Sequence, residues 1–359
     1  MTAIETPGGE ARALPRRAAG PGSRRRSKAR IGSVRYLARK LGFYLIAAWV
    51  ALTLNFFLPR LIPGNPVDVI IGHMARFGTP PPDEAQALGK ILGLGTGSLA
   101  SRYWQYLDSL AHLRLGVSVY EFPTPVATVI RQSIGWTLIL VGMATVISFA
   151  VGTGLGVLAG WKRGTWLDGL VPSTTFLTAV PYFWLALLLT YLFTQVFQLL
   201  PPSGGYDPTD NIGWNVQFIG SAVQHSILPA ATIVISSIGG WLLGMRNMMV
   251  STLSEDYVVA AEAKGIKPRR VMFKYAARNA ILPNVSGFAI SLGFVVSGSI
   301  VMEQVFNYPG IGNVLYNAVI NDDYPLMQGI FLVITLTVLG ANLLVDLLYT
   351  FIDPRTRHD

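Results

Sequence analysis

The stretch "EDYVVAAEAKGIKPRRVMFKYAARNAILPN", Glu255 to Asn284, stands between two long apolar runs of the chain. A glycine, Gly265, falls in the middle of a pattern that is otherwise helical. Six basic residues adjoin or follow this glycine: Lys264, Lys267, Arg269, Arg270, Lys274 and Arg278. A strongly apolar chain therefore places a charged, interrupted helix between two of its apolar segments.

Local signals in this stretch predict a helix, a turn and a second helix. Glu255 and Asp256 bring negative charge to a first helical turn, with Ser254 as its cap. Gly265 can take the left-handed geometry that ends a helix, and Pro268 is tolerated in the first turn of the next one. The second helix carries one basic stripe at a spacing of four residues: Arg270, Lys274 and Arg278. A loop lying on lipid headgroups explains these charges, whereas a docking helix also explains the glycine and the small alanine side chains.

The composition of the whole chain is that of a membrane protein. Of its 359 residues, 51% are hydrophobic and 13% are charged, against roughly 25% charged in an ordinary soluble domain. Six apolar runs are long enough to cross about 30 Å of hydrocarbon: 41–59, 135–160, 169–199, 227–249, 281–303 and 328–352. The sequence therefore predicts an all-α polytopic membrane protein with six transmembrane helices. The absence of cysteine excludes disulfide and thiolate chemistry.

The distribution of Lys and Arg sets the expected orientation. Of the 28 basic residues, 22 fall in residues 1–40, in the connection after the second run, in the stretch from Arg246 to Arg278, or at the C-terminal end. Because cytoplasmic loops carry an excess of Lys and Arg, both termini are expected in the cytoplasm. The net charge of +9 is then a topology signal and gives no reason to expect a nucleic-acid partner.

Two segments outside the apolar runs also carry predictions. Residues 1–40 form a basic tail that is expected to be disordered and attracted to anionic membrane lipid, and residues 353–359 form a second cytoplasmic tail. Residues 61–133 form an external segment with short helices, among them an amphipathic one in "SRYWQYLDSLAHL". This segment is too short to be an independent enzyme.

Features within the apolar runs point to packing and to a bend. Gly152, Gly156 and Gly160 recur at a spacing of four, which lets membrane helices approach closely. Pro181 is expected to kink the third run. Pro181 and the three aromatic residues that follow it are candidates for the lining of a translocation path: Tyr182, Phe183 and Trp184. The aromatic side chains are alternatively packing and interfacial anchors.

The chemistry missing from the chain limits its function. No apolar run has an ionisable residue in its central portion, although ion-coupled carriers usually need one. Glu303, Asp346 and Arg246 lie near the ends of runs, where structural or lipid-facing roles are expected. The four histidines lack metal-ligand spacing, and there is no nucleophile–base arrangement or Walker A loop. An enzyme is therefore not expected, and energy for uphill transport would come from another chain.

The interrupted helix resembles the EAA loop of binding-protein-dependent ABC importer permeases, in the form found in the dipeptide/oligopeptide permease family. The matching residues are Tyr257, Val258, Ala261, Ala263, Lys264, Gly265, Arg278, Asn279, Ala280, Leu282 and Pro283. Val259 stands where the general consensus has its glutamate, so the role of that glutamate is not assigned to Glu262. Further matches are "LIPGNP", "LGVS", "LPPSGGY", "FNYPGIGNVLYNAVINDDYP" and "DPR", so the resemblance covers roughly residues 35–357.

The resemblance implies a type I ABC importer transmembrane fold and a permease subunit in a bacterial inner membrane. It implies four kinds of partner: a second homologous permease, two ABC ATPase subunits, an extracytoplasmic substrate-binding protein and membrane lipid. ATP and Mg would be bound by the ATPases, so no cofactor is expected in this chain. The cytoplasmic loop 254–280 would be the coupling loop, with these residues involved: Glu255, Asp256, Tyr257, Ala261, Ala263, Lys264, Gly265, Arg278, Asn279 and Pro283.

The resemblance leaves the outer surface and the substrate partly open. "NYPGIG" and the acidic pair that follows suit docking of the binding protein, or equally a capped re-entrant turn, and involve Tyr308, Pro309, Gly310, Asp322 and Asp323. Oligopeptide is the favoured substrate, with oligosaccharide close behind and nickel less favoured. An ion-coupled secondary carrier is the rival from a different class.

Overall fold

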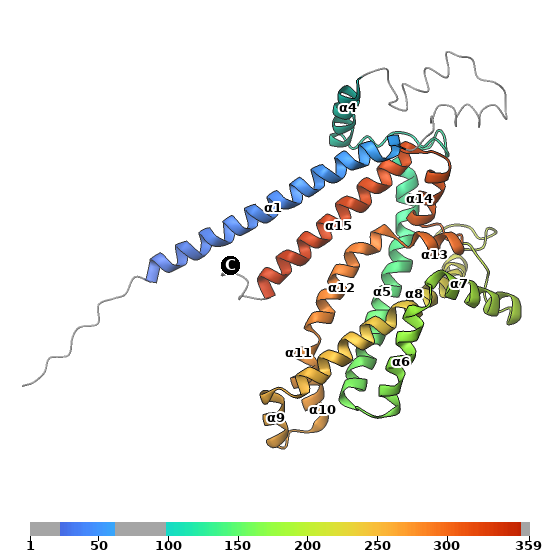
Figure 1. Cartoon of the computed structure of the whole chain (residues 1–359). Coiled ribbons are helices and arrows are strands. Elements are labelled where there is room, and N and C mark those ends of the chain that lie inside the picture. The colour runs from blue at the N-terminus through green and yellow to red at the C-terminus, as the bar shows by residue number, and fades with distance from the viewer. Residues whose placement is uncertain (1–21, 62–97, 353–359) are drawn as a thin grey trace, which may run out of the picture.

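The computed structural model describes residues 22–61 and 98–352, and within these ranges the chain is almost entirely helical. One isolated antiparallel bridge pairs Val117 with Pro125 in the described part. The helices form an elongated bundle in which α1 and α15 run side by side (Figure 1). The all-helical membrane fold expected from the sequence is confirmed.

Four long helices correspond to four of the predicted spans: α1 (Gly22–Leu61), α5 (Val126–Trp161), α8 (Val216–Leu253) and α15 (Tyr324–Ile352). By length and composition these four can each cross a membrane, and the number rises to six if each of two bent helix pairs is one span. The first bent pair is α6 (Trp166–Ala179) with α7 (Tyr182–Thr190) and the π-helix Tyr191–Val196. The second joins α10 (Pro268–Arg270), the π-helix Val271–Ala277 and α11 (Arg278–Ala280) to α12 (Leu282–Phe294).

The bend predicted at Pro181 is present. The two parts of the third span meet at an angle of 96°. Proline disfavours helical geometry in the residue before it, and Val180 accordingly has an extended backbone with φ −72° and ψ 128°. The ring of Pro181 thus ends α6 and starts α7.

The fifth predicted span, 281–303, is shorter in the structure. After α12, a 3₁₀ turn at Val295–Ser297 leads to Gly298, whose φ of 68° is left-handed. The separate helices α13 (Ile300–Val305) and α14 (Ile311–Ile320) follow. The prediction placed the end too late because the apolar run continues past the glycine that breaks the helix.

Of two predictions about the segments that flank the spans, one differs from the structure and the other is confirmed. Disorder was expected over residues 1–40, but α1 begins at Gly22; residues 1–21 lie outside the described residues, as do 353–359 and most of the external segment, 62–97. The amphipathic helix of the external segment is present as α4 (Leu99–Ala111). It packs on α1 through Tyr103 and Tyr106, whose ring centroids lie 5.2 and 5.5 Å from that of Phe56.

The most extensive helix contact in the described part of the chain is that of α5 on α8, at the glycines singled out in the sequence. A Cβ atom on Gly156 would lie 2.6 Å from the carbonyl oxygen of Leu242 and 2.7 Å from the Cβ of Met245. Gly152 and Gly160 make similar approaches to α8. The absence of side chains on this face of α5 therefore allows the two backbones to touch.

Candidate coupling loop and its attachment to the membrane helices

The charged loop has the predicted order of helix, glycine turn and helix. α9 (Asp256–Ala263) ends just before Gly265, whose φ is +74°. α10 begins at Pro268, as expected. Ser254 does not cap α9: its hydroxyl donates to the carbonyl of Ser251 at 2.7 Å, and Glu255 is the residue that precedes the helix. The predicted cap was wrong because Ser254 still belongs to the end of α8.

α9 has one face buried in its own chain and another that is open. Val258 is fully buried and Ala261 is 3% exposed, in a cluster with Met245 and Met249 of α8 and Val157 of α5. Val259 is 53% exposed, and the remaining members of the open face are also exposed: Glu255, Asp256, Tyr257, Ala260, Glu262, Ala263 and Lys264. The expectation that Ala261 meets a partner is corrected, because this side chain faces inward.

The two arms of the loop are tied together by one of the predicted pairs. The Nδ2 of Asn279 donates to the Oη of Tyr257 at 2.8 Å. The sequence singled out both residues, and the structure shows that they meet across the Gly265 turn. Pro283 lies apart from this contact, in the first turn of α12, where it is exposed.

The second arm carries the basic stripe on its outer side. Arg270, Lys274 and Arg278 are exposed, while Val271, Met272, Ala276 and Ala277 are buried beneath them. Within the described part of the chain, no acidic group lies within 4.0 Å of the three basic side chains. The stripe is therefore available to a partner or to anionic headgroups. The π-helical winding of this arm had no signal in the sequence.

A buried amide anchors the loop's return to the membrane. Asn284 is 7% exposed, and its Nδ2 donates to the carbonyl of Trp241 at 3.0 Å and to the Oγ1 of Thr153 at 3.3 Å. One side chain thus links α12, α8 and α5. Asn284 directly follows the matched Leu-Pro pair, and that adjacency was the one signal in the sequence that could have drawn attention to it.

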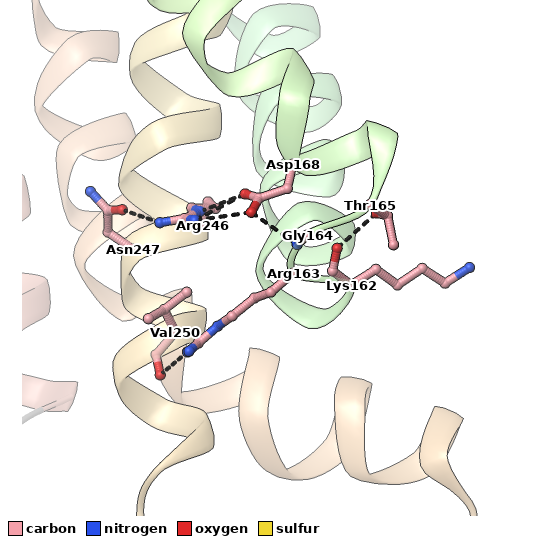
Figure 2. A network of polar contacts seen from close by, with 8 residues as sticks. All are labelled: Lys162, Arg163, Gly164, Thr165, Asp168, Arg246, Asn247 and Val250. Carbon is pink, nitrogen blue, oxygen red and sulfur yellow. Dashed lines mark hydrogen bonds and ion pairs between the residues drawn. The ribbon is translucent and has the colours of Figure 1, made fainter.

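A polar network beside the loop fixes α6 against α8 (Figure 2). Arg246 lies 3.0 Å from Asp168 through both Nε to Oδ1 and Nη2 to Oδ1. Arg163 donates to the carbonyl of Val250 at 2.7 Å. The backbone N–H of Gly164 and then the guanidinium of Arg246 hold the pKa of Asp168 below its usual range. The structural role expected for Arg246 now has a partner, which sequence reasoning did not identify.

The outer segment expected to dock a binding protein is mostly engaged within the chain. Tyr308 and Asp323 are fully buried, and Gly310 is buried as well. Asp323 accepts hydrogen bonds from the backbone N–H of Tyr120 and of Leu326, each at 3.0 Å, and from the hydroxyl of Ser118. Docking through these three residues is therefore corrected: the segment is polar because it satisfies its own fold. Pro309 and Asp322 remain partly accessible.

The aromatic residues after the Pro181 bend are open to the surroundings. Tyr182, Phe183 and Trp184 on α7 are 43%, 46% and 53% exposed. Their exposure fits a path, a lipid contact or a contact with another subunit. The path-lining role therefore stays a prediction.

The sequence of this chain is similar to those of known transport proteins. Residues 152–358 match the family model described as "Binding-protein-dependent transport system inner membrane component". The chain is 34% identical over 345 residues to the di/tripeptide transport system permease protein DppB of Pseudomonas aeruginosa, covering 90% of this chain and 98% of that one. It is 33% identical over 344 residues to the dipeptide transport system permease protein DppB of Escherichia coli, covering 90% and 99%. A putative peptide transport system permease of Brucella abortus is 34% identical over 311 residues, covering 85% and 93%.

Proposed function

We propose that this chain, which belongs to the family of binding-protein-dependent transport system inner membrane components, forms half of the translocation path of an ATP-driven peptide importer. The chain itself is a multi-pass permease subunit of an ABC importer. The observation that carries the proposal is that α9, at the end of the bundle opposite α4 and α14 (Figure 1), has one face buried against its own chain and one face exposed. We place that end in the cytoplasm of a bacterium, where the positive charge of the loop is concentrated.

The open face of α9 is the proposed contact with an ATPase subunit. Val259 and Ala263 offer a small apolar surface that could seat in a groove of the partner, beside the charged side chains of Glu262 and Lys264. Force applied to this face would pass to α8 and, through the shared buried cluster, to α5, because Val258 and Ala261 belong to one cluster with Met245, Met249 and Val157. Two partner ATPases would bind ATP and Mg and drive the movement, and a second, homologous permease would complete the path.

Peptide is the proposed substrate class. The relatives compared above are named as di/tripeptide, dipeptide and peptide permeases. The central portions of the apolar runs contain no Asp, Glu, Lys, Arg or His, so recognition of a peptide's charged ends is assigned to the external binding protein. The exposed aromatic side chains of α7 are proposed to line the path or to contact the second permease.

The outer docking surface is proposed to lie on the exposed side of α14. Tyr316, Val319 and Ile320 are 39%, 41% and 60% exposed there, next to the accessible Asp322. These residues replace the buried ones that sequence reasoning selected. An apolar face rimmed by polar groups is suited to contact with another protein.

The direct test is uptake of a labelled dipeptide by proteoliposomes that contain the complete transporter and receive the loaded binding protein. Uptake should require ATP on the side of α9 and should persist when ionophores collapse the ion gradients. Uptake by the chain alone that is abolished by the ionophore would show a secondary carrier instead. Ligand binding by the isolated binding protein, measured with peptides and with oligosaccharides, separates the two substrate classes.

A further inference from the structure

The carboxylate of Glu303 is the least expected buried group on the outer side of the molecule. Its side chain has no exposed surface. No Lys, Arg or His of the described residues lies within 4.0 Å of it. Because a buried carboxylate is costly unless it is hydrogen-bonded, its contacts should show why the position holds Glu.

Each oxygen of Glu303 accepts from a different element. The hydroxyl of Thr137, on α5, donates to Oε1 at 2.8 Å. The backbone N–H groups of Gly312 and Asn313, in the first turn of α14, donate to Oε2 at 2.6 and 3.1 Å. These N–H groups lack partners within their own helix, and the helix dipole favours a negative charge there. The oxygen of Thr137 also accepts from the N–H of Ile311 at 2.8 Å, which closes the arrangement.

Three glycines make room for this carboxylate. A Cβ atom on Gly312 would lie 2.9 Å from Oε2, and one on Gly298 would lie 3.0 Å from Oε1. A Cβ on Gly310 would collide with the carboxyl group itself. The φ of Gly310 is −91°, which any residue can adopt. Close approach to Glu303 is therefore the reason for glycine at position 310, and backbone conformation is not.

The Glu303 site joins the outer segment to the helix that reaches the coupling loop. α13 and α14 follow the break at Gly298, so Thr137 and Glu303 connect them laterally to α5. Near its other end, α5 contributes Val157 to the cluster that includes Val258 and Ala261 of α9. A single continuous helix thus shares a buried cluster with α9 at one end of the bundle and contacts the Glu303 site toward the other.

We propose that Glu303 is the positioning residue that fixes the outer segment Ile300–Ile320 to α5. Movement of α5 is thereby passed to the outer face, and engagement of that face by the loaded binding protein is passed back to the ATPases. The inference rests on the proposed function of the chain as an ABC importer permease. It adds a named residue through which the outer face and the coupling loop communicate.

The test measures ATP hydrolysis by the complete transporter in proteoliposomes, with and without the loaded binding protein. Glu303→Gln keeps the shape of the side chain, but its amide N–H₂ would face a group that donates a hydrogen bond in the wild type, either the Thr137 hydroxyl or the N–H groups of Gly312 and Asn313. We expect basal hydrolysis close to that of wild type and a loss of about fivefold or more in the stimulation by binding protein, the lower end of ordinary coupling between sites. Thr137→Val should cause a similar loss, and the double variant should lose little more than either single one.

Asp323→Asn is the matched control. Asp323 is also fully buried and also accepts from the first turn of a helix, but no hydrogen bond joins it to Thr137. We expect it to retain stimulation. Retained stimulation in Glu303→Gln, or an equal loss in Asp323→Asn, would overturn the inference.

A second pair of variants decides the matter if Glu303→Gln does not assemble. Gly310→Ala should lose stimulation by crowding the carboxyl group, and Glu303→Asp in the same chain, one methylene shorter, should recover part of it. No effect of Gly310→Ala, or no recovery, would overturn the inference. Failure of the proposed function is a separate result: the wild-type chain would then show neither association with an ATPase nor stimulation.

Discussion

At Asp168 a single side chain makes the stability of the end of the bundle that carries α9 depend on pH. Because the native pKa of Asp168 lies below its usual range, the charged form stabilises the fold at pH values above the unfolded pKa of about 3.9. This contribution disappears as the pH falls through the native pKa. We expect Asp168→Asn to unfold at a lower temperature than wild type at pH 7, with the difference closing in acid.

The measurement is the thermal unfolding midpoint of both proteins in nanodiscs at pH 7 and at successively lower pH. Arg246→Lys is the matched variant, since it keeps the charge of the partner but loses the fork that contacts Asp168 through two nitrogens. It should fall between wild type and Asp168→Asn. A difference between wild type and Asp168→Asn that stays constant over the whole pH range would contradict this account.

The sequence did not predict which side chains of α9 face the interior of the chain. The helix places apolar or small side chains at Val258, Val259, Ala260, Ala261 and Ala263, so no single apolar stripe marks the inner face. Only the packing of Met245 and Met249 shows that Val258 and Ala261 are the buried pair. Tertiary contacts also decide the environment of Tyr308 and Asp323, so the sequence could not show that these side chains are engaged within the chain.

At the scale of elements, the glycine face of α5 should tolerate no side chain. Gly156→Ala would place a Cβ 2.6 Å from the carbonyl oxygen of Leu242, and overpacking of this kind costs about 1–3 kcal/mol. Gly154 lies on the same helix with no atom within 4 Å of its position for a Cβ. Gly154→Ala should therefore leave stability unchanged or raise it by about 0.5–1 kcal/mol, because alanine is the better helix former.

Chemical or thermal unfolding of the two alanine variants in the same detergent makes this comparison. A destabilised Gly156→Ala beside an unaffected Gly154→Ala supports the α5–α8 contact. Equal stability of the two variants would show that the helices do not approach as closely as described.

The turn at Gly265 should be needed for function and not merely for stability. Its left-handed φ costs a residue with a side chain about 1–2 kcal/mol, and the same holds for Gly164, whose φ is +71° in the turn between α5 and α6. No atom lies within 4 Å of a Cβ at either position. Gly265→Ala and Gly164→Ala therefore impose the same local strain at different turns.

We expect Gly265→Ala to lower ATP-dependent uptake while Gly164→Ala retains it, measured in the same proteoliposomes and normalised to protein inserted. Equal losses would mean that backbone strain anywhere on this side of the membrane impairs the protein. That result would remove the special role assigned to the turn after α9.

The sequence largely predicted which helices are present, but it did not predict where they end. Six apolar runs, the bend at Pro181 and the break at Gly265 follow from chain-local signals, because proline and glycine restrict or free the backbone wherever they stand. The sequence did not show that the fifth span ends at Ser297, because apolar residues continue beyond this position. The hydrogen bonds of Glu303 to Thr137, Gly312 and Asn313, which hold the chain after the break, are tertiary contacts. The π-helices likewise have no local signal.

At the scale of the whole molecule, one continuous set of contacts links the charged loop that contains α9 to α13 and α14 at the other end of the bundle. α9 packs on α8 and shares a buried cluster with α5, α5 runs along α8 through its glycines, and Thr137 joins α5 to α13 and α14. Displacement of α9 would therefore act on a set of helices that are packed against one another. An importer that draws its energy from separate ATPase subunits requires this mechanical continuity.

The most direct test of the central claim uses single cysteines, because the chain has none of its own. Ala263→Cys and Ala261→Cys are compared in the complete transporter for cross-linking to the ATPase subunit, since these positions lie two residues apart on the open and buried faces of α9. The account predicts a cross-link from Ala263→Cys that changes in yield when ATP is bound, and none from Ala261→Cys. An assembled transporter in which Ala263→Cys fails to cross-link, or in which both positions do so equally, would contradict it.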